Sequence, residues 1–259
     1  MGVVNVTPDS FSDGGRYLDP AAALAHARKL LAEGADILDI GGESTRPGAQ
    51  PVSEDEELAR VRPLVEALRD ASIPISVDTR RPRVMREALR AGASMINDVE
   101  ALESPGALES VASSDCAICL MHKKGDPATM QRDPRYGDVV ADVKAYLAGR
   151  IAAAENAGID RSRIAIDPGF GFGKTPAHNL ELLRRLDELV AIGRPVVVGT
   201  SRKSFLGKLT GREVAGERVA GTVATNVLAL ERGAAIFRVH DVAANVEALT
   251  VAAATLRDS

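Results

Sequence analysis

Residues 75–99 have the sequence ISVDTRRPRVMREALRAGASMINDV, and this stretch decides the fold. A short apolar run, Ile75–Thr79, is followed by the helical pattern Pro82–Ala91. Pro82 favours the first turn of a helix and Gly92 favours its end. A second apolar run, Met95–Val99, follows directly. The stretch therefore predicts a strand, a helix and a second strand in close succession.

The same alternation occurs eight times along the 259 residues. The strand candidates are continuous apolar runs, as in parallel strands covered on both faces. They are Gly2–Val6, Asp36–Gly41, Ile75–Thr79, Met95–Val99, Ala117–His122, Ile164–Asp167, Val196–Gly199 and Ala235–His240. The helices predicted between them include Pro20–Glu33, Ser53–Ala71, Pro82–Ala91, Val139–Ala157, Ala177–Val190, Glu217–Arg232 and Ala243–Leu256.

Eight strand–helix repeats in a chain of this length favour an α/β fold of one domain, residues 1–259, closed into a (β/α)8 TIM barrel. A doubly wound open sheet is the alternative, because periodicity alone does not show closure. A net charge of −4 argues against a nucleic-acid surface. The sequence has no apolar stretch long enough to span a membrane, and Met1–Val6 does not resemble a signal peptide, so we expect a cytoplasmic protein.

Cys116 and Cys119 have C-x-x-C spacing, which suggests redox chemistry or zinc binding. They lie in an expected strand, where residues three apart point to opposite faces. No second Cys or His pair completes a zinc site. We therefore expect two buried, unreactive thiols.

Polar residues follow the expected strands at the ends where a barrel carries its chemistry. Asp39, Asp78, Asn97 and Asp167 would converge on one mouth of the barrel, where buried carboxylates need donors or cations. A heterocycle rich in N–H groups would supply those donors. For Asp98, Asp241 and Glu43 we favour the simpler interpretation of helix caps or loop hydrogen bonds.

The glycine-rich segment Gly169–Thr175 is not a phosphate loop, because Pro168 occupies the position of the first required glycine. We expect its backbone to approach a flat ligand closely, with Phe172 as an aromatic wall. The basic side chains at the same mouth are Arg46, Lys203, Arg238 and His240. Arg238 and His240 alternate along the last strand, and the loops after strands seven and eight commonly bind phosphate in barrels.

Over nearly its whole length the sequence resembles the bacterial dihydropteroate synthase family. The segments that carry the resemblance are Asn5–Gly15, Gly41–Gly48, Ser76–Thr79, Ile96–Asp98, Asp167–Lys174, Ser201–Ser204 and Arg238–Asp241. The resemblance implies a transferase of folate biosynthesis that joins a pterin pyrophosphate to p-aminobenzoate, is inhibited by sulfonamides and forms a homodimer through its later helices. Where the family has Met-His-Met-Gln-Gly, this chain has Lys123 and Lys124 in the segment Met121–Gly125.

The resemblance also implies roles for individual residues. The pterin would be bound by Asp78, Asn97, Asp167, Lys203 and Arg238. The pyrophosphate would be bound by Thr45, Arg46, Arg238 and His240, with Mg2+ as cofactor on Asn5. The surroundings of p-aminobenzoate would be Phe11, Ser12, Pro47, Phe172 and Ser204.

Two other functions are compatible with the barrel. A methyltetrahydrofolate-binding methyltransferase shares the pterin site but should lack the Thr45–Pro47 and Ser201–Ser204 elements, which are present here. A non-catalytic pterin-binding paralogue would be expected to have lost Asn5, Asp78 or Lys203, and all three are present.

Overall fold

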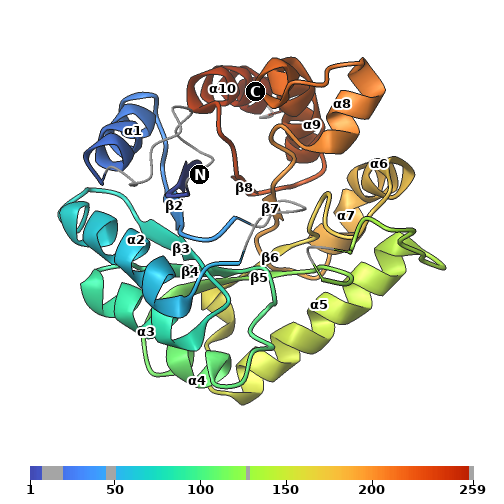
Figure 1. Cartoon of the computed structure of the whole chain (residues 1–259). Helices are drawn as coiled ribbons and strands as arrows, with labels where there is room; N and C mark the ends of the chain where they lie inside the picture. Colours follow the sequence, from blue (N-terminus) through green and yellow to red (C-terminus); the bar gives the residue numbers. More distant parts are fainter. Residues whose placement is uncertain (8–19, 45–50, 127–128, 257–259) are drawn as a thin grey trace.

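A computed structural model describes residues 1–7, 20–44, 51–126 and 129–256. Eight short parallel strands stand at the centre of a ring of helices (Figure 1). The strands are β1 (Gly2–Asn5), β2 (Leu38–Gly41), β3 (Ile75–Asp78), β4 (Met95–Asp98), β5 (Ala117–Met121), β6 (Ile164–Asp167), β7 (Val197–Val198) and β8 (Ile236–Phe237).

The helices alternate with these strands and cover their outer face. They are α1 (Pro20–Ala32), α2 (Glu54–Ala67), α3 (Pro82–Ala91), α4 (Ala107–Ala112), α5 (Val139–Asn156), α6 (Pro176–Arg184), α7 (Leu186–Val190), α8 (Ser204–Thr210), α9 (Val219–Glu231) and α10 (Val242–Leu256). Two 3-10 helices, η2 (Arg161–Arg163) and η3 (Ala215–Arg218), precede β6 and α9. None of the helices in the described ranges is long and apolar enough to cross a membrane.

The strands close into a barrel. Strands β1 to β6 form one parallel sheet in chain order, and β7 pairs with β8. Two single bridges complete the circle, Ile166 with Val196 and Gly2 with Val239. At the second seam Val3 N–H donates to the Val239 carbonyl at 3.0 Å. The predicted (β/α)8 barrel is confirmed, and the open-sheet alternative is excluded.

Most predicted elements are present, with some differences. The predicted helix Ala177–Val190 is two helices, α6 and α7, because the backbone leaves helical geometry at Arg185 (φ −107°, ψ 30°). Helices α4 and α8 were not predicted. Helix α8 has seven residues and α4 has six, so each is too short to give a clear periodic pattern. Strands β7 and β8 are shorter than predicted.

Alternate residues of each strand face different environments. The outward side chains, such as Val77, Ile96 and Ile118, pack with the helices in the main core. A small inner cluster of Met95, Cys119, Ala165 and Val197 fills the barrel below the polar mouth. Cys116 belongs to the outer core and Cys119 to the inner cluster, and both thiols are free and buried. The prediction that the two sulfur atoms diverge is therefore confirmed.

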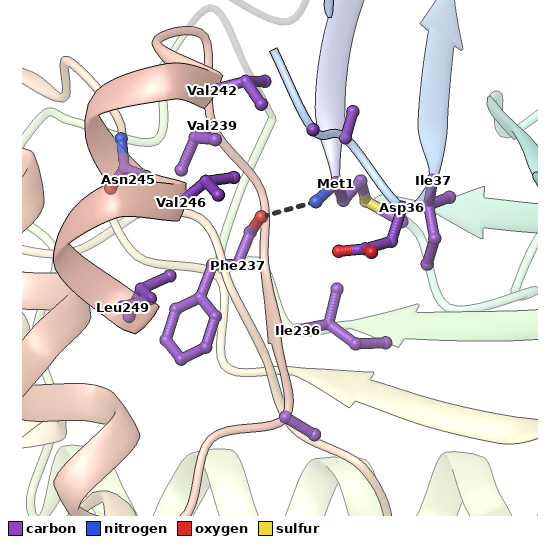
Figure 2. A pocket seen from close by; sticks show the side chains of 13 residues that line it. Met1, Asp36, Ile37, Ile236, Phe237, Val239, Val242, Asn245, Val246 and Leu249 are labelled. Carbon is purple, nitrogen blue, oxygen red and sulfur yellow. Dashed lines mark hydrogen bonds between the residues drawn. The ribbon is translucent and has the colours of Figure 1, made fainter. Parts of the chain in front are cut away.

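A cavity of 170 Å³ lies at the opposite end of the barrel from this mouth, between Met1 and helix α10 (Figure 2). Its walls are mainly apolar and include Ile236, Phe237 and Leu249. The Met1 nitrogen donates to the Phe237 carbonyl at 3.0 Å and holds the start of β1 against β8. This cavity is separated from the polar mouth by the inner apolar cluster.

Candidate active site

A second cavity, of 460 Å³, opens at the carboxyl ends of the strands. Every predicted site residue that lies in the described ranges lines it. These residues are Asn5, Asp78, Asn97, Asp167, Phe172, Lys203, Ser204, Arg238 and His240. The predicted residues Phe11, Ser12, Thr45, Arg46 and Pro47 lie outside the described residues.

An arginine from the last strand crosses the barrel at the base of this cavity. Arg238 Nε donates to Asp39 Oδ2 at 2.6 Å, and a terminal nitrogen of its guanidinium donates to Asp78 Oδ2 at 2.9 Å. Asp39 is fully buried and also accepts hydrogen bonds from Ser76 at 2.6 Å and Asn97 at 3.2 Å. Strands β2, β3, β4 and the end of β8 are thus joined through one polar network.

Sequence reasoning placed Asp39 at the mouth but gave it no binding role. The structure makes it the common acceptor of Ser76, Asn97 and Arg238. The alternation of Leu38, Asp39 and Ile40 along a buried strand was the available signal, because it points Asp39 inward. We infer that Asp39 orients Asn97 and Arg238 from beneath the cavity.

Burial shifts the protonation of the ionisable groups here. It raises the pKa of Asp78 to about 7 even though Arg238 opposes the shift. The pKa of Asp167 is raised for the same reason, against its hydrogen bond from the Gly169 amide. Burial lowers the pKa of Lys203 to about 8, with Asp167 acting in the other direction. Buried carboxyl groups and a lysine whose pKa values are all shifted within one cavity are typical of a functional site.

Asp167 and Lys203 occupy the opposite wall from Asp78. The Gly169 N–H donates to Asp167 Oδ1 at 2.6 Å and fixes one carboxylate oxygen. Lys203 Nζ lies 4.0 Å from the centre of the Phe172 ring, a cation–π distance. An aromatic face, an ammonium group and a carboxylate therefore lie together where β6 and β7 end, which suits a flat polar ligand.

The rim beyond β7 and β8 is cross-linked. Ser201 Oγ lies 2.9 Å from His240 Nδ1 of the imidazole ring, and it accepts from the backbone N–H of His240 at 3.1 Å. Arg202 forms a bidentate pair with Asp241: Nε donates to Oδ2 at 2.9 Å, and a terminal nitrogen on the same edge of the guanidinium group donates to Oδ1. Arg202 has a left-handed backbone (φ 57°), which is uncommon for a residue with a side chain and is found at functional loops. The sequence analysis included Ser201 and Arg202 in a family segment, but it gave neither residue a role of its own and did not predict this ion pair.

Three acidic residues were expected to be caps or loop hydrogen bonders. Asp98 fits, because its carboxylate accepts from the Glu100 and Leu102 amides at 2.8 Å each. Asp241 instead forms the ion pair with Arg202. Glu43 accepts from the Val52 N–H at 3.4 Å, as expected of a loop hydrogen bonder, and it also pairs with Arg81 at 3.0 Å and Arg80 at 3.3 Å.

Lys123 and Lys124, which depart from the family pattern, have different partners. Lys123 Nζ is 2.8 Å from Glu100 Oε1, and Arg80 is 3.5 Å from the same oxygen. Lys124 stands over the Tyr136 ring, 4.2 Å from its centre, and donates to the Arg135 carbonyl. Neither lysine lines the cavity.

Comparisons with known proteins agree with this geometry. The family model described as pterin binding enzyme matches residues 1–240. Dihydropteroate synthase of Escherichia coli K12 is 50% identical, with 99% of this chain and 91% of that protein covered. A structure of the Xanthomonas albilineans dihydropteroate synthase with 4-aminobenzoic acid has a TM-score of 0.95 at 56% identity, covering 100% of this chain and 93% of that one. The Xanthomonas enzyme with 7,8-dihydropteroate has a TM-score of 0.91 at 53% identity, covering 100% and 94%.

A closed (β/α)8 barrel with carboxylates, an amide and a lysine around one mouth is the pterin-binding architecture, and the chain belongs to the pterin binding enzyme family. Within this family it is a bacterial dihydropteroate synthase, a transferase of folate biosynthesis. The methyltransferase and the non-catalytic paralogue are thereby set aside.

Proposed function

We propose that the cavity binds a dihydropterin pyrophosphate through Asp78, Asn97, Asp167 and Lys203. The edge of a pterin carries ring N–H and amino groups, which need acceptors, and a carbonyl, which needs a donor. Two carboxylates and an amide supply the acceptors, and the Lys203 ammonium supplies the donor. The observation that carries this proposal is the convergence of these four side chains, from four different strand ends, on one cavity.

Arg238 and His240 would hold the pyrophosphate, together with Thr45 and Arg46, and Arg238 would also lie against the pterin face. Their charges would stabilise the departing anion, while Asp78 and Asp167 would stabilise the positive charge left on the pterin methylene. The aniline nitrogen of p-aminobenzoate would then attack the methylene carbon and lose one proton to solvent or to the departed pyrophosphate, which gives dihydropteroate. No protein nucleophile is required.

Asn5 would bind Mg2+ together with the pyrophosphate. Its side-chain oxygen lies beside Gly41 at the cavity, and an amide oxygen is a suitable donor for this hard cation. One neutral oxygen is a weak site on its own, which fits a metal ion that arrives with the pyrophosphate. When bound, Mg2+ would neutralise charge on the leaving group.

Phe172 and Ser204 would form the described part of the p-aminobenzoate site, and Phe11, Ser12 and Pro47 the remainder. Phe172 offers a ring face and Ser204 begins α8 beside Lys203, so the pair suits an aromatic acid. Sulfonamides carry an aniline opposite an acidic group, as p-aminobenzoate does. The protein would therefore be a sulfonamide target, with drug and p-aminobenzoate in competition.

The protein would form a homodimer through its last three helices. The large apolar side chains exposed in the described ranges all belong to the region of α8 to α10: Leu209, Val214, Leu228, Val246, Val251 and Leu256. Val251 is 64% exposed and Leu256 50%. Helices α9 and α10 pack side by side (Figure 1), so these residues can contribute to a common surface. Light scattering measures the expected doubling of mass.

The site assignment is tested with Asp167→Asn, which keeps the size of the side chain and removes its charge. An unpaired ligand N–H should cost about 1–3 kcal/mol, so calorimetry should find pterin pyrophosphate binding weakened roughly 5- to 150-fold. Turnover should fall with it. Asp142→Asn, on the exposed side of α5, is the matched control and should bind normally. Unchanged binding by the Asp167 variant would remove it from the pterin site.

A further inference from the structure

Lys174 is a buried cation at the end of the glycine-rich loop that follows β6. Its side chain reaches back into the loop, and the residue is only 3% exposed. Lys174 Nζ donates to the Gly169 carbonyl at 2.9 Å and to the Phe172 carbonyl at 3.1 Å. It also lies 2.9 Å from His122 Nδ1 and 3.5 Å from the His122 carbonyl. These acceptors are all neutral.

The backbone of the loop after β6 packs directly against the backbone of the loop after β5. A Cβ atom added at Gly169 would lie 1.8 Å from the His122 carbonyl oxygen. One added at Gly173 would lie 2.2 Å from the Lys124 carbonyl oxygen. Both glycines have left-handed backbone angles, φ 69° and 63°. Only glycine allows this approach, and Lys174 fills the polar space between the loops.

The contact with His122 requires a neutral imidazole. Burial and, after it, the nearby Lys174 charge lower the pKa of His122 to about 3. The ring is enclosed by Tyr146, with centroids 5.0 Å apart. Nδ1 is then the acceptor for the ammonium, and the ring hydrogen is on Nε2. Lys174 therefore fixes the tautomer of His122 as well as two carbonyl groups.

Stability alone does not account for this lysine. Burial lowers the pKa of Lys174 to about 7, because its ammonium group loses hydration and forms no ion pair with a carboxylate of the described residues. In this value the Asp167 charge opposes burial, and the charges of Lys203 and Lys124 act with it. An apolar side chain would avoid this cost, so a role in the site is the better explanation.

Two of the three carbonyls that Lys174 binds belong to residues that support the active site. Gly169 accepts from Lys174 and donates its N–H to the Asp167 carboxylate at 2.6 Å. Phe172 accepts from Lys174 through its carbonyl and presents its ring to Lys203 at 4.0 Å. Lys174 is thus connected to Asp167, a proposed pterin ligand, through Gly169. It contacts Phe172, the proposed wall of the p-aminobenzoate site, directly.

We propose that Lys174 is a positioning residue for dihydropteroate synthesis: through Gly169 and Phe172 it sets the Asp167 carboxylate and the Phe172 ring against the two substrates. This inference rests on the site roles proposed above for Asp167 and Phe172. It adds a residue that does not line the cavity and that needs no contact with either substrate.

The test is a double-variant cycle with Lys174→Met and Phe172→Leu in the full chain. Misplacement of a wall by a fraction of an ångström can cost about tenfold or more, so Lys174→Met alone should raise KM for p-aminobenzoate by about that factor. If Lys174 acts through Phe172, the double variant should be no worse than Phe172→Leu alone. Lys124→Met, which removes an ammonium from the adjoining loop, is the control and should leave both KM values unchanged.

The same cycle is run for pterin pyrophosphate binding with Asp167→Asn in place of Phe172→Leu. If Lys174→Met does not fold, Lys174→Gln keeps two N–H donors and replaces it. Fully additive effects in both cycles would overturn the inference with either variant, and normal KM values would overturn it in folded Lys174→Met, which has no donor. Weak binding by Asp167→Asn together with a normal Lys174 variant would leave the proposed function intact and reject only the positioning role.

Discussion

Replacing Asp78 by Asn should make the protein more stable at alkaline pH while it loses pterin binding. Asp78 is a buried carboxyl group whose pKa rises from 3.8 to about 7, chiefly through desolvation. Between these two values the folded protein holds a proton that the unfolded chain has released. The contribution of Asp78 to stability is therefore largest at acidic pH, and it is lost as the pH rises toward 7.

The size of the effect follows from the same values. Each pKa unit corresponds to about 1.4 kcal/mol, so protonation of Asp78 contributes at most about 4 kcal/mol to the free energy of unfolding. This contribution is lost as the pH rises from 3.8 to about 7. The Asp78 side chain is 16% exposed, so solvent screening reduces this free energy below the upper limit. Between about pH 5 and pH 8.5, the free energy of unfolding of Asp78→Asn should therefore rise by about 1–2 kcal/mol relative to that of the wild type.

Urea unfolding of both proteins at these two pH values measures the difference. Asp142→Asn is the control on an exposed helix face, and its difference from the wild type should stay within about 0.5 kcal/mol at both. Pterin pyrophosphate binding by Asp78→Asn should fall roughly 5- to 150-fold at about pH 8.5, where the wild-type carboxylate is ionised and one acceptor is lost. A stability difference that is the same at both pH values would refute the protonation argument.

Three further outcomes are expected. Asn5→Ala should raise the Mg2+ concentration needed for half-maximal turnover, and excess chelator should abolish turnover in both proteins; activity that persists in chelator would remove the metal from the reaction. A sulfonamide should raise KM for p-aminobenzoate without changing KM for the pterin, and inhibition kinetics that are competitive with the pterin would place the drug elsewhere. Lys123→Met should cost less than about 1 kcal/mol in thermal unfolding at low salt and less still in about 1 M salt, because its partner Glu100 is 18% exposed and keeps Arg80; a larger loss would show that the pair is structurally essential.

The barrel could be predicted from the sequence because its strands are uninterrupted apolar runs and its helices have clear boundary residues. Pro82 and Gly92 delimit α3 as predicted. The convergence of Asp78, Asn97 and Asp167 could also be predicted, since parallel strands bring their carboxyl ends to one edge. These inferences need only local patterns and the topology.

Contacts between loops could not be predicted in the same way. His122 and Lys174 are 52 residues apart, and Arg202 and Asp241 are 39 apart. Their pairing depends on backbone angles that composition does not show, such as the left-handed conformation of Arg202. Asp39 was missed as a network centre for another reason: its partners come from three other strands, and no single segment shows that they share it.

The two single-bridge seams on either side of the β7–β8 pair have a consequence for local opening. A closed barrel has no free edge strand at which unfolding could begin. A seam held by a single bridge has few backbone hydrogen bonds, so local opening should be easiest there. Arg238 spans the barrel from the end of β8 to Asp39 and Asp78, so the side chains of the mouth help to keep the last two strands in place. Any ligand that binds Arg238 or Lys203 should slow amide hydrogen exchange at Val196–Val198 and Ile236–Val239 more than elsewhere. Hydrogen exchange at these amides would therefore report ligand binding in the cavity.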